Sequence, residues 1–231
     1  MRLKWIVLAA VIIIVGVFFV LPVIAPAVTV TGVLRDGQVV AGDTFMLMNQ
    51  SGIALTFYDD ALATSASDSG ILKKKGEALI TAGRTREAGQ IYRQLLSQNA
   101  NDTAVLVRTG DLLYLEGDYT GAISYYDTAL TFRPDDAKIW MREGDAYLVL
   151  AMIEEQARYD AAKERSKQSG TPFAVEPIES TESYTKAVDR YGQAMKLDPR
   201  LTITVQSRLI GATESEVNGY PVLPGESRSS H

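Results

Sequence analysis

The chain has 231 residues, 46% of them hydrophobic, and a formal net charge of −5, which is enough apolar material for a folded domain. It contains no cysteine, and its single histidine is the last residue, His231, so disulfides, thiolate metal sites and imidazole-based catalysis are excluded. Lys and Arg form no stripe outside residues 73–75 and 158–167, so nucleic acid is not an expected partner. No cofactor motif is present, and we expect no cofactor and no metal site.

The first predicted element is a transmembrane helix or signal-anchor over residues 5–25, after a basic N-terminus at 1–4. The apolar run from Trp5 to Leu21 has no polar face, and twenty such residues in a helix reach roughly 30 Å. The run is longer than the apolar region of a signal peptide, so a retained anchor is favoured, with cleavage near Ala27 left open. The positive-inside rule predicts a single-pass membrane protein with a cytoplasmic N-terminus and an extracytoplasmic remainder.

After a linker at 26–34, the dominant pattern is a 34-residue period. Four Gly-acid pairs mark it: Gly42-Asp43, Gly76-Glu77, Gly110-Asp111 and Gly144-Asp145. Alanine, tyrosine and leucine columns keep the same register: Ala54, Ala88 and Ala122; Tyr58, Tyr92 and Tyr126; Leu62, Leu96 and Leu130. A period of this length is the sequence signature of a helical solenoid. A 31-residue insertion separates Gly144 from the columns' next members, Ala187 and Tyr191.

These columns resemble the tetratricopeptide repeat, in which Trp-x-x-Leu-Gly-x-x-Tyr is followed by Ala-x-x-x-Phe and a closing proline. The fourth repeat carries the pattern as Trp140, Glu143, Gly144, Tyr147, Ala187, Tyr191 and Pro199. Glu143 stands in the leucine slot, and the first repeat lacks both the aromatic residue and the glycine before its second helix. The resemblance implies an all-α, right-handed α-solenoid of about four helix-turn-helix repeats. We interpret the Gly and Tyr columns as packing positions.

The predicted domain division follows the period. The repeat domain spans 35–216, with repeats at 35–68, 69–102, 103–136 and 137–201, an insertion near 152–182, a capping helix at 202–216 and a disordered tail at 217–231. The first repeat is the least regular, because residues 28–31 alternate like a short strand and Asp36-Gly37 favours a turn.

The insertion predicts one long helix and a loop. Residues 137–167 are rich in helix-forming side chains, and a 31-residue helix would be about 46 Å long. Gly170 and Pro172 would end it, and Ser180 and Thr181 are candidate caps of the returning helix, as Asp118 is for the second helix of the third repeat. The insertion is either an arm that meets a partner or a solvent-facing excursion.

The resemblance implies a concave groove lined by the first helix of each repeat. Its predicted partner-binding residues are Val39, Asp43, Met46, Lys73, Glu77, Ile80, Val107, Asp111, Tyr114, Met141, Asp145 and Leu148. Only Lys73 matches the donors with which some family members clamp an acidic C-terminus, so that ligand is not expected. The four acids, about 10 Å apart, are too widely spaced to share a metal ion. We expect a protein or peptide ligand with basic and apolar residues.

The sequence therefore predicts a membrane-tethered protein-interaction scaffold of a prokaryotic envelope, not an enzyme. The alternative is a self-assembling structural component, forming a homo-oligomer, of an envelope complex; a remote alternative is a hydrolase. Asn49 and Asn101 are glycosylation sequons where a compartment has the machinery.

Overall fold

The structure, a computed structural model, describes residues 30–170, 178 and 181–217. The described residues are almost entirely α-helical and contain no strand, and the first helix begins at Val30, where a strand was the alternative expectation. The chain divides into two compact units, 1–95 and 96–231.

The predicted membrane topology is not upheld. Within the described residues, no helix is both long enough and apolar enough to cross a membrane. The predicted span at 5–25 and the predicted disordered tail, from 218 onward, lie outside the described residues. The expectation of a single-pass membrane protein with an extracytoplasmic repeat domain is therefore corrected, because the part of the chain that the structure describes supplies no spanning helix.

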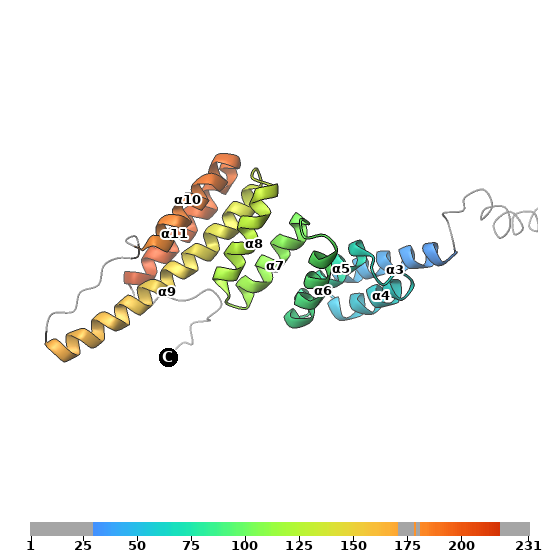
Figure 1. The fold of residues 1–231 in the computed structure, drawn as a ribbon, viewed down its shortest axis with the longest axis horizontal. Helices are drawn as coiled ribbons and strands as arrows, with labels where there is room; N and C mark the ends of the chain where they lie inside the picture. The colour runs from blue at the N-terminus through green and yellow to red at the C-terminus, as the bar shows by residue number, and fades with distance from the viewer. Residues whose placement is uncertain (1–29, 171–177, 179–180, 218–231) are drawn as a thin grey trace, which may run out of the picture. The chain divides into compact units, whose positions relative to one another are not determined.

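The first unit is built from helical hairpins (Figure 1). Its helices are α3 (Val30–Leu47), α4 (Ser51–Thr64), α5 (Ser69–Thr81) and most of α6 (Thr85–Gln98). α3 packs on α4, and α4 packs in turn on α5. Consecutive helices are therefore the ones that bury each other's apolar faces, as a stacked repeat requires.

The second unit continues the same arrangement with one much longer helix (Figure 1). Its elements are α7 (Thr103–Leu115), α8 (Tyr119–Phe132), α9 (Ala137–Ser169), α10 (Glu182–Leu197), the 3-10 turn η3 (Pro199–Leu201) and α11 (Thr202–Val217). α8 packs between α7 and α9, and α10 lies along α9.

Three hairpin turns contain a residue with a left-handed backbone, again 34 positions apart. These are Asn49, Gly83 and Gly117, with φ of 56°, 73° and 84°. After each, the following N–H donates to a carbonyl five residues back, which satisfies the end of the preceding helix. Asparagine tolerates this conformation better than other side chains. Asn49 therefore replaces the glycine that the first repeat lacks.

The next position in this column explains the long helix. Thirty-four residues after Gly117 stands Ala151, a fully buried helix-forming residue in place of a turn glycine. α9 accordingly continues for 33 residues, roughly 50 Å, two residues beyond the predicted 137–167. It ends at Gly170, whose φ of 67° is left-handed.

Aspartates begin the first helix of the later hairpins. Asp68, Asp102 and Asp136, also 34 apart, accept hydrogen bonds from backbone N–H groups in the first turns of α5, α7 and α9. Asp118 caps α8 and Thr181 caps α10, as the sequence predicted for both residues.

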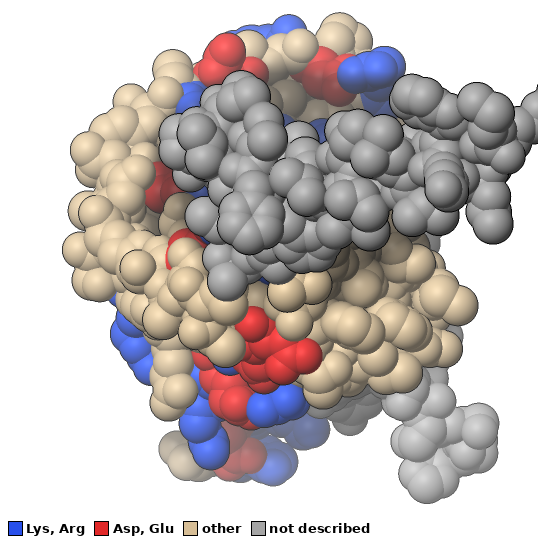
Figure 2. Space-filling view, turned by 90° about the vertical axis from the view of Figure 1, so that its right-hand side faces the viewer, with Lys and Arg blue, Asp and Glu red and all other residues tan. Residues whose placement is uncertain are grey.

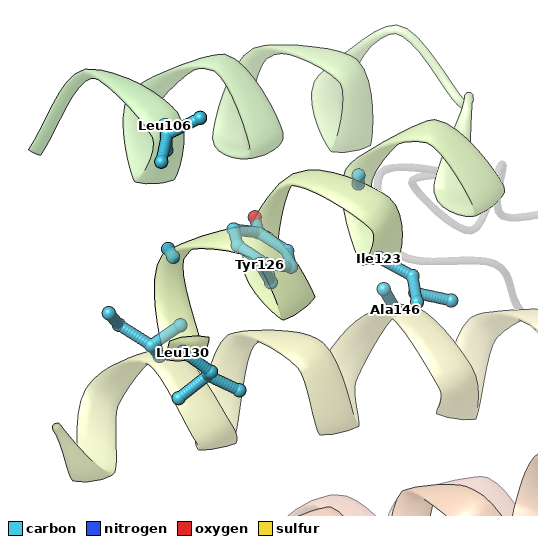
Figure 3. Packing of buried hydrophobic residues seen from close by; sticks show 8 residues of the cluster. Leu106, Ile123, Tyr126, Leu130 and Ala146 are labelled. Atoms are coloured by element: carbon cyan, nitrogen blue, oxygen red, sulfur yellow. The ribbon is translucent and has the colours of Figure 1, made fainter. Parts of the chain in front are cut away.

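The core repeats one contact between a tyrosine and a glycine. Tyr58, Tyr92, Tyr126 and Tyr191 are each at most 2% exposed. Each ring lies against the glycine of a Gly-acid pair, where an added Cβ would come within 2.5 to 2.8 Å of a ring carbon. Figure 3 shows Tyr126 on α8, with Leu106 of α7 to one side of the helix and Ala146 of α9 to the other. Only glycine lets the two helices of a hairpin approach this closely.

We expect Gly110→Ala to destabilise the fold. The new methyl group would meet the packed ring of Tyr126, and overpacking of a core costs about 1–3 kcal/mol. Urea unfolding followed by circular dichroism measures the change. Gly192→Ala is the matched control, because this helical glycine has no atom within 4 Å of the added Cβ and the substitution should stabilise by about 0.5–1 kcal/mol. Equal effects of the two substitutions would contradict the packing role.

Candidate functional site

The predicted groove residues all lie on the first helices of the hairpins. Six are in the first unit, on α3 and α5, and six are in the second, on α7 and α9. Most are half-buried, Glu77 is exposed, and Leu148 is buried in the hydrophobic core. Their role in binding stays a prediction, and their surroundings show what such a surface could recognise.

The three aspartates among the four acids of the groove bond to tyrosines of their own hairpins. The hydroxyl of Tyr58 donates to Asp43 Oδ1 at 2.8 Å, and that of Tyr126 donates to Asp111 Oδ1 at 2.9 Å. Tyr191 donates to Asp145 Oδ1 at 2.7 Å across the insertion. The Gly-acid pair is therefore one structural device, because the glycine receives the tyrosine ring and the adjacent acid accepts the hydroxyl.

Each of these aspartates also bonds to a cation from the next helix that lines the same surface. Lys74 Nζ lies 2.8 Å from Asp43 Oδ2, and Arg142 Nε lies 2.8 Å from Asp111 Oδ1. Arg208 of α11 pairs with Asp145 in the same way. These three aspartates are thus paired with cations within the fold, and a basic ligand would have to compete with these partners.

The sequence held a signal for these cations that sequence analysis missed. Lys74, Arg108 and Arg142 are spaced by 34 residues, so they form a basic column beside the acidic one. Arg208 could not be found in this way, because it follows the insertion and lies on the helix after the last repeat. A search of the sequence for opposite charges 31 residues apart would have paired Asp43 with Lys74 and Asp111 with Arg142.

Burial governs the protonation of these groups. Loss of water raises the pKa of Asp145, and bonds from Tyr191 and Arg208 only partly oppose that effect. Burial also raises the pKa of Tyr126 and Tyr191, and the neighbouring carboxylates add to the shift. Both hydroxyls therefore stay protonated at neutral pH and act as hydrogen-bond donors.

One pocket, of about 380 Å³, opens among three of the helices of the second unit, α7, α9 and α11. Its lining residues are Tyr114, Asp145, Leu148, Val149, Met152, Arg208, Gly211 and Ala212. Three of them, Tyr114, Asp145 and Leu148, belong to the predicted groove. Of the others, Val149 lies on the regular part of α9, Met152 on its extended part, and the rest on α11, which the repeat register does not reach. The pocket combines an apolar wall with a single, internally bonded ion pair.

A buried acid lies at the junction of α8, α9 and α10. Glu143, in the leucine slot of the repeat, is 0% exposed, and its Oε1 accepts a hydrogen bond from Arg190 Nε at 2.7 Å. Its Oε2 is buried without a hydrogen-bond partner. The Arg190 guanidinium lies over the rings of Trp140 and Tyr147. Burial raises the pKa of Glu143 to about 7, with Asp127 adding to the shift and Arg190 opposing it.

Figure 2 shows acidic and basic side chains next to one another on the face that it draws. This mixture agrees with the paired charges described above. Within the described part of the chain, no three acidic or histidine side chains converge in a way that could hold a metal ion.

The comparisons agree with this fold. Residues 73–137 match the tetratricopeptide repeat family. Among solved structures, MamA 41-end from Desulfovibrio magneticus RS-1 is similar at 16% identity, with a TM-score of 0.53 over 84% of this chain and 99% of that one. A further structure, titled "Crystal structure of MamA", has 12% identity and a TM-score of 0.52 over 72% and 79% of the two chains.

No curated protein matches the chain in sequence. At such low identities the solved structures bear on the fold alone. Together with the family match, they support an all-α solenoid of tetratricopeptide type.

We expect Asp111→Ala to destabilise the second unit more than Tyr126→Phe does. Tyr126→Phe removes one hydrogen bond and leaves the ion pair with Arg142 intact, a loss of about 1 kcal/mol. Asp111→Ala leaves a buried hydroxyl without its acceptor, which costs about 1–3 kcal/mol, in addition to the lost ion pair. Urea unfolding measures both, with the exposed Asp135→Ala as control. A larger effect of Tyr126→Phe would contradict the assignment.

We expect the stability to depend on the protonation of Glu143. Its pKa is about 7 in the folded chain against 4.5 for an ordinary glutamate, so the folded state binds the proton more tightly. This tighter proton binding stabilises the fold fully below about pH 4.5. The stabilisation declines as pH rises and is lost above about pH 7, which lowers the free energy of unfolding by about 3 kcal/mol.

Thermal and urea unfolding between pH 5 and 8 measure this effect. Glu143→Gln keeps the acceptor for Arg190 but cannot ionise, so the difference between variant and parent should grow with pH in favour of the variant. A difference that does not vary with pH would show that Glu143 is not the titrating group.

Proposed function

We propose that this chain is a protein-interaction scaffold that binds a segment of a protein or peptide partner on the surface formed by the first helices of its hairpins. The observation that carries the proposal is the pocket among α7, α9 and α11, which contains three residues of the predicted groove. Solenoid repeats characteristically use such surfaces for recognition. The family match over residues 73–137 supports the same class of function.

The lining of the pocket suits an apolar anchor. Leu148, Val149 and Met152 form its wall on α9, and methionine adapts to side chains of different shapes. A large apolar side chain buried there would contribute about 1.5–3 kcal/mol, the scale of a binding hot spot. We therefore propose a partner segment with one large apolar residue at its centre.

The ion pair in the lining of the pocket would set the orientation of a bound segment. Asp145 and Arg208 already bond to each other, so a partner gains most by bonding to both ends of the pair without separating them. A backbone N–H beside Asp145 and a carbonyl or carboxylate beside Arg208 would meet this condition. Basic residues of the partner, expected from the sequence, would lie outside the pocket.

The bonds that hold the acidic side chains in place also favour a binding role over a catalytic one. The carboxylates of Asp43, Asp111 and Asp145 each bond to a tyrosine and a cation, and those bonds fix them in place. A general acid or base has to reach the reacting group of a substrate. We therefore propose no enzymatic activity.

The test is to fill the pocket without disturbing the fold. A peptide library displayed on phage is selected on the purified full-length chain, and the affinities of the selected peptides are measured by fluorescence anisotropy. Gly211 lies on the pocket lining, and an added Cβ there meets no atom within 4 Å. We expect Gly211→Leu to weaken binding at least tenfold, because its side chain occupies the space of the anchor.

Gly192→Leu is the matched control. Gly192 is also a helical glycine with open space around the added Cβ, but it lies on α10 and outside the pocket lining. Binding should be unchanged in this variant. Selected peptides that bind the parent and Gly211→Leu equally well would refute the pocket as the binding site.

A further inference from the structure

One face of α3 presents an exposed apolar stripe. Val33, Val40 and Leu47, seven residues apart, are 58%, 64% and 89% exposed. Gly37 and Thr44 lie between them on the same face, and they are exposed as well. Apolar residues at this spacing form the seam along which one helix packs against another.

The positions of Gly37 and Thr44 are covered on later helices, whereas those of Val40 and Leu47 become Lys74 and Thr81 on α5, which are half-buried and exposed. One period after Gly37 and Thr44 stand Ile71 and Ala78 of α5, which are 4% and 0% exposed, and α4 packs against α5. In the second unit, Ile139 and Ala146 of α9 hold the equivalent positions, both at most 2% exposed, and α8 packs against α9. On α5 and α9 the preceding helix thus covers the part of this face that holds Gly37 and Thr44 on α3, where both residues are exposed among the described residues.

The chain's own upstream sequence is poorly suited to supply the missing helix. Three periods before α8, the register assigns residues 17–30 to a covering helix, and Pro22 and Pro26 stand inside that window. A proline within a helix removes a backbone hydrogen bond and costs about 3 kcal/mol or more. The sequence of this window therefore disfavours a regular covering helix.

We propose that the stripe on α3 binds the same stripe of a second copy of this chain, so that two α3 helices pair about a two-fold axis. A surface is self-complementary in such a pairing, and an apolar seam without net charge meets that condition. The charges that border the stripe, Arg35 and Asp36, bond to each other at 2.9 Å. They therefore add no repulsion between copies.

The glycine in the stripe agrees with a close helix contact. An added Cβ at Gly37 would meet no atom within 4 Å, so packing inside the chain does not require glycine there. An exposed glycine within a helix costs roughly 0.5–1 kcal/mol relative to alanine. A second helix passing over Gly37 gives this residue a structural role, because small residues let two backbones approach.

This pairing goes beyond the proposed function, because it lies in the first unit and uses none of the residues that line the pocket. Val40 is near the middle of the stripe, so the two copies of Val40 should lie close to the two-fold axis. That placement gives a test by crosslinking, and the absence of cysteine from the chain makes any introduced thiol unique.

The first experiment compares Val40→Cys with Leu115→Cys under mild oxidation. Leu115, on α7, is 63% exposed, close to the 64% of Val40, so the two thiols are matched in accessibility. The full-length chain is kept in a mild non-ionic detergent to prevent nonspecific association of apolar residues 5–24. We expect Val40→Cys to form a disulfide-linked dimer at least ten times faster than Leu115→Cys. Equal rates would overturn the proposal.

The second experiment measures the mass of the particle by sedimentation velocity over a hundredfold range of concentration. The parent chain and Leu115→Glu should form dimers, whereas Val40→Glu should be monomeric, because a carboxylate would be buried at the seam. Circular dichroism of Val40→Glu should show unchanged helix content, since the side chain is exposed within one copy. A parent chain that is monomeric throughout, or a Val40→Glu variant that still forms dimers, would reject α3 as the interface.

Discussion

The fold depends on the contact between a tyrosine ring and a glycine, with the tyrosine hydroxyl bonded to the acid that follows the glycine. Three hairpins make the complete contact, through Asp43, Asp111 and Asp145, and all four place the ring on glycine. The contact fixes how closely the two helices of a hairpin approach. It also places the acid where a cation from the following hairpin, or from α11 after the last one, can reach it. One repeated pair of residues therefore joins packing within a hairpin to attachment between successive elements.

Because of this arrangement, the aspartates of the acidic column act first as structural residues that hold the helices together. Asp43, Asp111 and Asp145 have the register of groove residues, yet in the folded chain their charge is balanced by Lys74, Arg142 and Arg208. Recognition on this surface is therefore expected to depend on apolar contacts beside the ion pairs. Substitution of the acids would disturb stability as well as binding, and this is why the test of function fills the pocket instead.

The features particular to this chain arise where its sequence departs from the repeat pattern. Ala151 replaces a turn glycine, so α9 runs on and supplies Met152 to the pocket. Glu143 replaces a core leucine, so the junction with α10 gains a group that titrates near neutrality. Val40 stands where later repeats have a cation that pairs with the acid of the preceding repeat. The position 34 residues before Asp43 is Ala9, so the series has no earlier acid for a cation at position 40 to pair with. The first helix thereby gains an apolar surface suited to association.

By itself, the sequence determined the helical class, the period, the packing role of the Gly and Tyr columns, the long helix in the insertion and the caps at Asp118 and Thr181. These follow from local rules, since helix propensity, capping and a repeat period act over a few residues or one repeat. Only the tertiary structure decided which charges pair, that Glu143 is buried beside Arg190, and that α11 completes a pocket. Those outcomes depend on side chains 31 to 63 residues apart in the chain, and such distances in space are set by the packing of whole helices.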